Sequence, residues 1–164
     1  MALTLVLGGV RSGKSAFAEG LVAGEALYLG TLVGDDEETS ERIVSHQARR
    51  PMHWPTVVAV DRLAERAAEA GQTTVLLDGF GLVVAAALNA PEPALRVAAE
   101  VSGILDDSRR RDWIVVSEEV GLSLVATTPL GRRFQDLLGE ANQALARAAA
   151  RVVLVVAGRP LDLP

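Results

Sequence analysis

Near its start the chain reads, in order, Gly8-Gly9-Val10-Arg11-Ser12-Gly13-Lys14-Ser15. This segment fits the pattern G-x-x-x-x-G-K-[ST] at every fixed position, and it lies between an apolar run at 3–7 and a stretch of helical period that begins at 14. Glycines let the backbone fold so that successive N–H groups face phosphate oxygens, and the N-terminus of the following helix adds partial positive charge. The alternative is a glycine-rich turn that carries Lys and Ser by chance. The predicted strand before the segment and the predicted helix after it favour a phosphate-binding loop instead. The segment therefore predicts a phosphate-binding loop (P-loop), in which Lys14 contacts the β- and γ-phosphates of a nucleotide and the Ser15 hydroxyl binds Mg²⁺.

Apolar, β-rich runs follow one another along the chain, separated by stretches of helical period. The runs are short and continuous, which is typical of strands that are covered on both faces of a sheet. We expect strands near 3–7, 26–31, 56–60, 74–78, 113–117 and 152–157. We expect helices near 14–23, 36–49, 62–70 and 129–150, and within the broad region 79–108, which is broken at 90–94. This order predicts one α/β domain over 1–164, with a mostly parallel sheet and helices on both of its faces.

The composition of the chain excludes several classes of protein. Its 164 residues are the length of one domain, and its 16 basic and 21 acidic residues give a net charge of −5, which argues against a nucleic-acid partner. The chain has no cysteine, which excludes disulfides, Cys-ligated zinc and a cysteine nucleophile. The longest apolar runs, such as 82–88, are far shorter than the ~18 residues of a membrane span, and no signal peptide is recognisable, so we expect a cytoplasmic protein. Every basic residue is Arg except Lys14.

Two acidic segments end predicted strands and are candidates for a magnesium site. Asp78 follows 75–77, and Glu118 and Glu119 follow 113–117. In a P-loop enzyme, a carboxylate at the end of a neighbouring strand supports the metal that the loop hydroxyl binds. A carboxylate in such a place can equally be a helix N-cap or a solvated loop residue. Taken together, the two segments predict Mg²⁺ bound by Ser15 and supported by Asp78 or Glu119.

Both histidines of the chain fall in one short segment. A helix over 36–49 would place two arginines and a histidine on one face, namely Arg42, His46 and Arg49 or Arg50. Arginine binds phosphate in a bidentate manner and a neutral imidazole attacks phosphorus, so this face is a candidate to receive a nucleotidyl group. A solvated basic face with an idle His46 fits the same spacing, and spacing alone favours it. For His53, beyond the end of the predicted helix, we expect a loop or packing role.

The motifs of the chain, taken together and in order, resemble those of one enzyme family. The first group comprises the P-loop segment, Tyr28-Leu-Gly-Thr31, Asp35-Asp-Glu37, Arg42-Ile43-x-x-His46-x-x-x-Arg50-Pro51, Trp54 and Thr56. The second group comprises Leu76-Leu-Asp78, Val115-Val-Ser-x-Glu119-Val-Gly121, and the patterns that run from Leu130 to Gln143 and from Val153 to Leu161. Over almost the whole chain this combination resembles the bifunctional adenosylcobinamide kinase/adenosylcobinamide-phosphate guanylyltransferase family of cobalamin biosynthesis. The combination is much more specific than the P-loop alone.

The resemblance implies a RecA-like P-loop fold and two successive reactions. In the first, GTP or ATP phosphorylates the aminopropanol hydroxyl of adenosylcobinamide. In the second, GMP passes from GTP to adenosylcobinamide phosphate through a guanylylated histidine, whose position here is His46. The nucleotide contacts implied outside the P-loop are Thr31, Leu32, Val33, Gln47, Ala48, Arg49, Arg50 and Asp78. The resemblance also implies a homo-oligomer, which we expect to be a homotrimer.

The chain departs from the family pattern in places. Val58 stands where the family usually has a Glu that contacts the nucleotide, so we expect the preference for guanine to be weaker by about 1–3 kcal/mol. Glu118 stands where Asn is common in the family. Two other functions stay open: a small-molecule P-loop kinase without nucleotidyl transfer, in which His46 has no catalytic role, and a nucleotide-binding regulator without catalysis.

Overall fold

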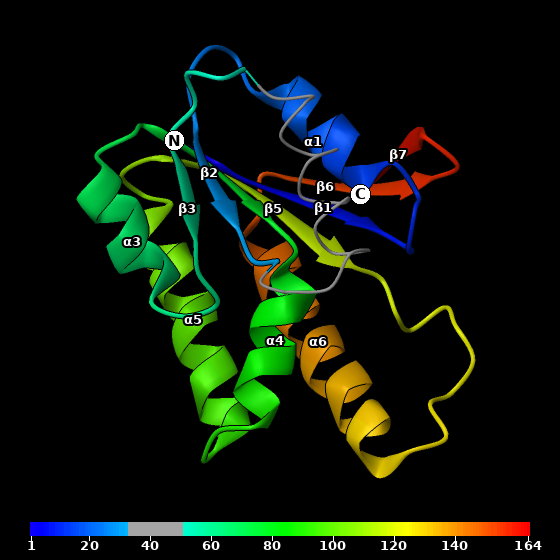
Figure 1. Cartoon of the computed structure of the whole chain (residues 1–164). Helices are drawn as coiled ribbons and strands as arrows, with labels where there is room; N and C mark the ends of the chain where they lie inside the picture. The colour runs from blue at the N-terminus through cyan, green and yellow to red at the C-terminus, as the bar shows by residue number, and fades with distance from the viewer. Residues whose placement is uncertain (33–50) are drawn as a thin grey trace.

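The computed structural model describes residues 1–32 and 51–164. Within these two ranges, seven strands form one sheet in the order β3-β2-β4-β5-β1-β6-β7 (Figure 1). All neighbouring strands run parallel except β6 and β7, which are antiparallel. The strands are β1 (Leu3–Gly8), β2 (Leu27–Gly30), β3 (Thr56–Val58), β4 (Thr74–Asp78), β5 (Asp112–Glu118), β6 (Arg151–Val156) and β7 (Arg159–Leu163). The predicted helix over 36–49 lies outside the described residues, together with Val33, His46 and residues 47–50.

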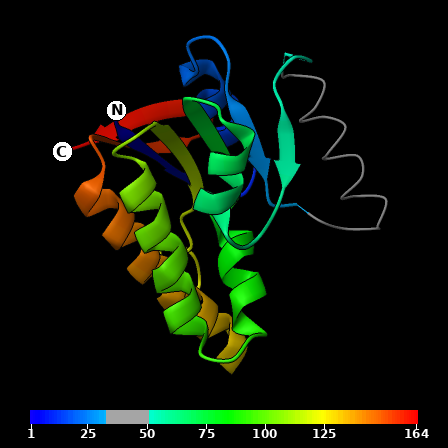
Figure 2. The same cartoon turned by 90° about the vertical axis from the view of Figure 1, so that its left-hand side faces the viewer.

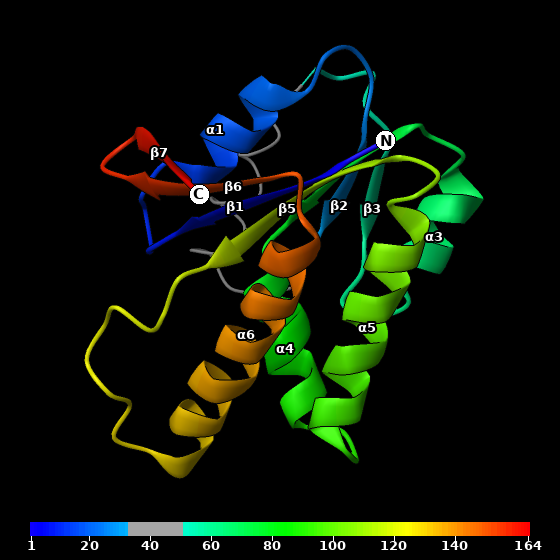
Figure 3. The same ribbon diagram turned by 180° about the vertical axis from the view of Figure 1, so that it is seen from behind.

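Helices lie on both faces of the sheet, as the sequence predicts. The helix α1 (Lys14–Leu21) covers one face, and the other described helices cover the opposite face (Figures 1 and 3). These are α3 (Leu63–Ala70), α4 (Phe80–Leu88), α5 (Pro93–Asp107) and α6 (Pro129–Ala148). The interval between α4 and α5 falls at the Pro-rich break that was predicted at 90–94. Figure 2 shows α4, α5 and α6 side by side below the sheet, where they pack against one another.

The apolar strands are buried on both faces, which explains why their sequences do not alternate. Leu5 and Val6 are neighbours in β1 and point to opposite faces, and both are fully buried. Leu5 packs with Val115 in the cluster that contains side chains of α3 to α6, whereas Val6 packs in the cluster that contains Ala18 of α1. The centre of the sheet is therefore a rigid support for the residues at the ends of its strands.

The strand β7 is absent from the sequence prediction. It returns antiparallel to β6 after a tight turn in which Ala157 and Gly158 have φ values of 50° and 74°. Positive φ at both central residues is the geometry of the two-residue turn that matches the twist of a hairpin. Outside the turn, Arg151 forms an ion pair with Asp162, and this pairing lowers the pKa of the Asp162 carboxyl. All five residues of β7 are exposed. The sequence of this strand therefore shows neither the apolar run nor the alternation that marks a buried strand.

Replacing Leu5 with alanine is expected to lower the free energy of unfolding by about 3 kcal/mol, because the buried side chain leaves a cavity in the central strand. Leu95→Ala is the matched control, since Leu95 is 63% exposed on α5. Urea denaturation followed by circular dichroism measures both variants. Equal stability of the two variants would contradict this account of the core.

Candidate active site

The P-loop segment connects β1 to α1 in the arrangement that the sequence predicts. Gly8 is the last residue of β1, and Lys14 is the first residue of α1. Gly13 caps the helix with a φ of 91°, a conformation that only glycine adopts without strain. Within the loop, the Ser12 N–H donates to the Gly9 carbonyl at 3.3 Å. The loop therefore leads into the N-terminus of α1, where free backbone N–H groups favour a bound anion.

The turn between β6 and β7 supports this loop from the other side. The Gly158 N–H donates to the Ser12 carbonyl at 2.7 Å. A Cβ on Gly13 would lie 3.2 Å from the Gly158 Cα, and a Cβ on Gly8 would lie 2.7 Å from the Val155 carbonyl oxygen. The loop and the turn are thus in close backbone contact. Sequence reasoning missed this support, although the Gly-Arg-Pro tripeptide at 158–160 is a recognisable turn signal.

Asp78 and Ser15 come together at the carboxyl end of the sheet. The Ser15 hydroxyl donates to Asp78 Oδ1 at 2.9 Å, and the Tyr28 hydroxyl donates to Asp78 Oδ2 at 2.8 Å. Parallel pairing of β2 with β4 places Gly30 level with Asp78, so the strand ends meet at the same edge. A serine hydroxyl and a carboxylate are oxygen donors of the kind that Mg²⁺ prefers, and they need phosphate oxygens or water to complete its coordination. These two residues therefore fit the predicted metal.

Thr31 lies beside this pair and holds the turn that follows Asp78. Its buried hydroxyl is 2.9 Å from the Asp78 carbonyl oxygen and 2.8 Å from that of Gly79, and can donate to either. Gly79 has a φ of 102°, and a Cβ at this residue would collide with the Thr31 hydroxyl. The structure thus brings Thr31 and Asp78, two of the predicted nucleotide contacts, to the same edge as the P-loop. Leu32, the next predicted contact, is half-buried at the end of the first described range.

The two consecutive glutamates at the end of β5 have different surroundings. Glu118 Oε1 lies 3.8 Å from Lys14 Nζ, and Glu118 Oε2 accepts a hydrogen bond from the Gly81 N–H at 2.9 Å. Glu119, which the sequence predicts as a support of the metal, accepts a hydrogen bond from the Gly121 N–H of its own loop at 2.6 Å. Lys14 also donates to the Gly9 carbonyl at 3.3 Å. Among the described residues, the acidic side chain at the P-loop lysine is therefore Glu118.

The remaining predicted residues lie apart from this edge or outside the described ranges. His46 and residues 47–50 lie outside the described ranges, so their roles beside the nucleotide stay a prediction. His53 is exposed in the segment before Trp54, and the Trp54 indole N–H donates to the Gly24 carbonyl at 3.0 Å. In residues 1–32 and 51–164, no three His, Cys, Asp or Glu side chains form a cluster that could hold a metal. A Mg²⁺ that is bound partly by nucleotide phosphates needs no such cluster.

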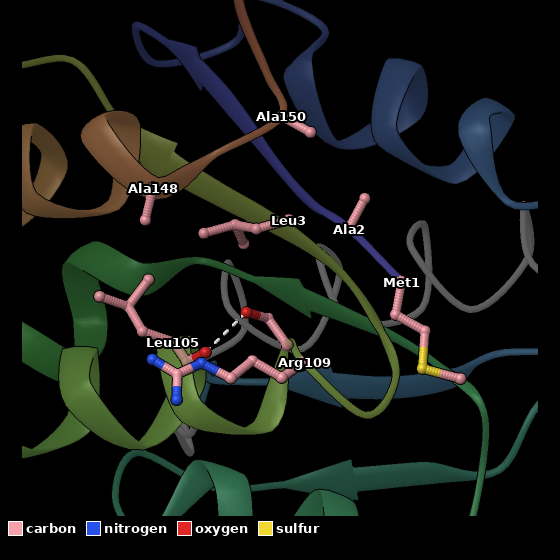
Figure 4. A pocket seen from close by; sticks show the side chains of 8 residues that line it. Met1, Ala2, Leu3, Leu105, Arg109, Ala148 and Ala150 are labelled. Carbon is pink, nitrogen blue, oxygen red and sulfur yellow. Dashed lines mark hydrogen bonds between the residues drawn. The ribbon is translucent and has the colours of Figure 1, made fainter.

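A hollow at the opposite end of β1 is a poor candidate for the chemistry. It is lined by side chains from Met1 to Leu3, from the end of α5 and from the end of α6 (Figure 4). Arg109 is the lining residue with a charged side chain, and its Nη1 lies 3.7 Å from Asp106 Oδ1. The P-loop, Asp78 and Glu118 all lie at the other end of the strands.

None of the helices that the structure describes is long and apolar enough to cross a membrane.

Solved structures with the same fold support the RecA-like architecture. A KaiC-like protein, PH0186 from Pyrococcus horikoshii OT3, aligns with a TM-score of 0.50 and 14% identity over 93% of this chain and 71% of that protein. The RadB recombinase aligns with a TM-score of 0.52 and 16% identity over 93% of this chain and 73% of that protein. At these identities the likeness concerns the fold alone.

Comparisons of the sequence identify closer relatives. A bifunctional adenosylcobalamin biosynthesis protein, CobP from Pseudomonas aeruginosa, is 38% identical over 167 residues, which cover 97% of this chain and 95% of the relative. A second bifunctional adenosylcobalamin biosynthesis protein, CobU from Escherichia coli K12, is 35% identical over 176 residues. The match covers 95% of this chain and 96% of that relative. The family model described as cobinamide kinase / cobinamide phosphate guanyltransferase matches residues 4–163. With almost the whole chain matched, this protein belongs to the CobU family of cobinamide kinases and cobinamide phosphate guanyltransferases.

Proposed function

We propose that this protein phosphorylates the aminopropanol hydroxyl of adenosylcobinamide and then transfers GMP from GTP to the new phosphate. The products would be adenosylcobinamide-GDP and pyrophosphate. The observation that carries the proposal is the pairing of Ser15 with Asp78 beside the P-loop, in a chain that belongs to this family over nearly its whole length. A P-loop with a carboxylate at this place suits phosphoryl transfer from a nucleoside triphosphate.

In the first reaction, the P-loop backbone would hold the triphosphate through its N–H groups. Lys14 would leave its contact with Glu118 and bind the β- and γ-phosphate oxygens, which are stronger partners because they carry more charge. The transfer itself depends mainly on positioning and on stabilising charge. Either GTP or ATP fits these contacts, because the P-loop residues recognise phosphates and not the base.

Ser15 and Asp78 are the residues that we propose to hold Mg²⁺. Held there, Mg²⁺ would supply positive charge that offsets the negative charge of the phosphate groups. Glu119 stays a predicted support of the metal, and its Oε1 accepts a hydrogen bond from its own loop. Tyr28 fixes the second oxygen of Asp78 and would thereby orient the carboxylate toward the ion.

In the second reaction, we propose His46 as the nucleophile. An imidazole nitrogen of His46 would attack the α-phosphorus of GTP, and the bond to the departing pyrophosphate would break. A phosphate oxygen of adenosylcobinamide phosphate would then attack the same phosphorus and release the histidine. Arg42, Arg49 and Arg50 would stabilise the phosphate oxygens in both steps. These assignments rest on the family resemblance of residues outside the described ranges.

We propose further that the protein works in the cytoplasm, where nucleoside triphosphates are available, and as a homotrimer. Leu122, Leu124 and Val125 are 82%, 93% and 77% exposed in the loop between β5 and α6. Exposed apolar side chains that follow one another in this way support an assembly that would cover them. Sedimentation analysis measures the number of copies.

Transfer of label from the γ-phosphate of GTP or ATP to adenosylcobinamide tests the first reaction. We expect labelled adenosylcobinamide phosphate with the wild-type protein and Mg²⁺. Label on the corrinoid without subsequent GMP transfer would favour a simple kinase. Nucleotide binding without either reaction would favour a non-catalytic regulator.

Asp78→Asn is expected to raise the Mg²⁺ concentration that gives half-maximal kinase activity by about 10- to 100-fold, because a neutral amide supports the cation less well. Asp61→Asn is the matched control, since Asp61 is exposed in the segment after β3. Titration of Mg²⁺ at saturating nucleotide measures both variants. An unchanged Mg²⁺ requirement in Asp78→Asn would contradict the proposed metal site.

A further inference from the structure

Glu118 faces the P-loop lysine from the strand next to β1. In the parallel register of β1 and β5, Gly8 pairs with Glu118, so the first P-loop residue and this glutamate are level at the edge of the sheet. Glu118 Oε1 lies 3.8 Å from Lys14 Nζ, and the two side chains are 27% and 12% exposed. The carboxylate is therefore partly shielded from water and lies next to the group that would bind the γ-phosphate.

Two hydrogen bonds hold Glu118 in its position, one to its side chain and one to its backbone. Its Oε2 accepts a hydrogen bond from the Gly81 N–H in the first turn of α4, and a Cβ on Gly81 would collide with this oxygen. Its backbone carbonyl accepts a hydrogen bond from Asn142 Nδ2 at 3.0 Å. Asn142 is itself buried on α6 and accepts a hydrogen bond from the Ser117 hydroxyl at 2.7 Å. One oxygen of Glu118 is thus held by the helix, and the other is directed toward the site.

The neighbouring carboxylates have other partners. Asp78 accepts hydrogen bonds from Ser15 and Tyr28, and Glu119 accepts one from Gly121. A triphosphate bound to Lys14 would replace the ion pair of Glu118 with this lysine, and the hydrogen bond from Gly81 would still hold the other carboxylate oxygen. Glu118 Oε1 would then be available to a group that approaches the γ-phosphate.

We propose that Glu118 is a catalytic residue of the kinase reaction that orients the acceptor hydroxyl and takes its proton. The hydroxyl oxygen would form a bond to the γ-phosphorus, and the bond from that phosphorus to the β–γ bridging oxygen would break. The electron pair would leave with the nucleoside diphosphate, and the hydroxyl proton would pass to Glu118 Oε1. This inference rests on the proposed kinase activity and assigns a residue to it.

The kinase reaction and GMP transfer differ in whether their acceptor carries a proton, so comparing them tests Glu118 as a proton acceptor. The acceptor in the kinase reaction is a hydroxyl, which must lose a proton, whereas the acceptor in GMP transfer is a phosphate oxygen that is already ionised. Loss of a proton acceptor should therefore slow the first reaction alone. Loss of support for Lys14 should instead weaken nucleotide binding and slow both reactions.

Glu118→Gln keeps the size of the side chain and removes its charge. We expect kcat of the kinase reaction to fall by about 10²- to 10³-fold, with the KM for nucleotide changed by no more than about threefold. GMP transfer to supplied adenosylcobinamide phosphate should stay within about threefold of the wild-type rate. Glu118→Asp, which keeps a carboxylate, should retain more kinase activity than Glu118→Gln. Glu140→Gln, at an exposed residue of α6, is the matched control that should behave like the wild type.

Kinase turnover in Glu118→Gln within about threefold of the wild-type rate would overturn the proposal, and so would an equal fall in both reactions. Thermal unfolding of each variant separates a folding defect from a catalytic one. If Glu118→Gln is unstable, the kinase and GMP-transfer rates of Glu118→Asp are compared with the wild type, and an equal fall in both would overturn the proposal. A wild-type protein without adenosylcobinamide kinase activity would overturn the proposed function and this inference together. An active wild type with an equally active Glu118→Gln would overturn only the role of Glu118.

Discussion

Replacing Lys14 with alanine is expected to lower kcat/KM of both the kinase and the guanylyl-transfer reaction by about 10³-fold, because each needs the positive charge beside the triphosphate. The amine reaches this place from the first residue of α1, where it now lies between the Gly9 carbonyl and Glu118. Steady-state kinetics with adenosylcobinamide, and with adenosylcobinamide phosphate plus GTP, measure the two effects separately.

Lys14→Arg tests whether charge alone is enough. A guanidinium is broader than an ammonium, and the P-loop backbone is already in close contact with the turn at Gly158. We therefore expect this variant to remain well below the wild type in both reactions. Nearly wild-type activity of Lys14→Ala would contradict the assignment of this loop as the site of the triphosphate.

Replacing His46 with alanine is expected to lower the rate of GMP transfer by about 10⁴-fold or more, because the reaction loses its nucleophile. Phosphorylation of adenosylcobinamide should continue, since that reaction uses no covalent histidine. GTP labelled at the α-phosphate, followed by denaturation, should leave an acid-labile and alkali-stable adduct on the wild-type protein and none on His46→Ala.

His53→Ala is the matched control for this experiment. His53 is exposed, and the change removes the same side chain from a nearby segment. We expect this variant to form the adduct at the wild-type level. An adduct that persists in His46→Ala and disappears in His53→Ala would move the nucleophile to His53.

The order of strands and helices along the chain could be predicted, because most of the strands are short apolar runs that are buried on both faces of the sheet. Leu3–Gly8 and Thr74–Asp78 agree with the predicted runs to within a residue, since each has a sharp end at a glycine or a carboxylate. The strand Arg159–Leu163 could not be predicted in this way. It is exposed along its whole length and contains Pro160, so neither burial nor β propensity distinguishes it from a loop.

The candidate site was predictable where a residue's place follows from its own strand or loop. The P-loop and Asp78 are examples, because each directly follows a buried strand. The sequence could not predict which of the two consecutive glutamates, Glu118 or Glu119, lies next to the P-loop lysine. This placement depends on the register of β5 against β1 and on the approach of α4 at Gly81, and both are set by contacts between distant parts of the chain.

The order in which the wild-type protein forms its corrinoid products tests the two proposed reactions together. Wild-type protein is incubated with adenosylcobinamide, GTP and Mg²⁺, and the corrinoid products are followed over time by chromatography and mass spectrometry. We predict that adenosylcobinamide phosphate forms first and is then converted to adenosylcobinamide-GDP with release of pyrophosphate. Adenosylcobinamide that stays unmodified while the protein binds GTP would contradict the proposed function.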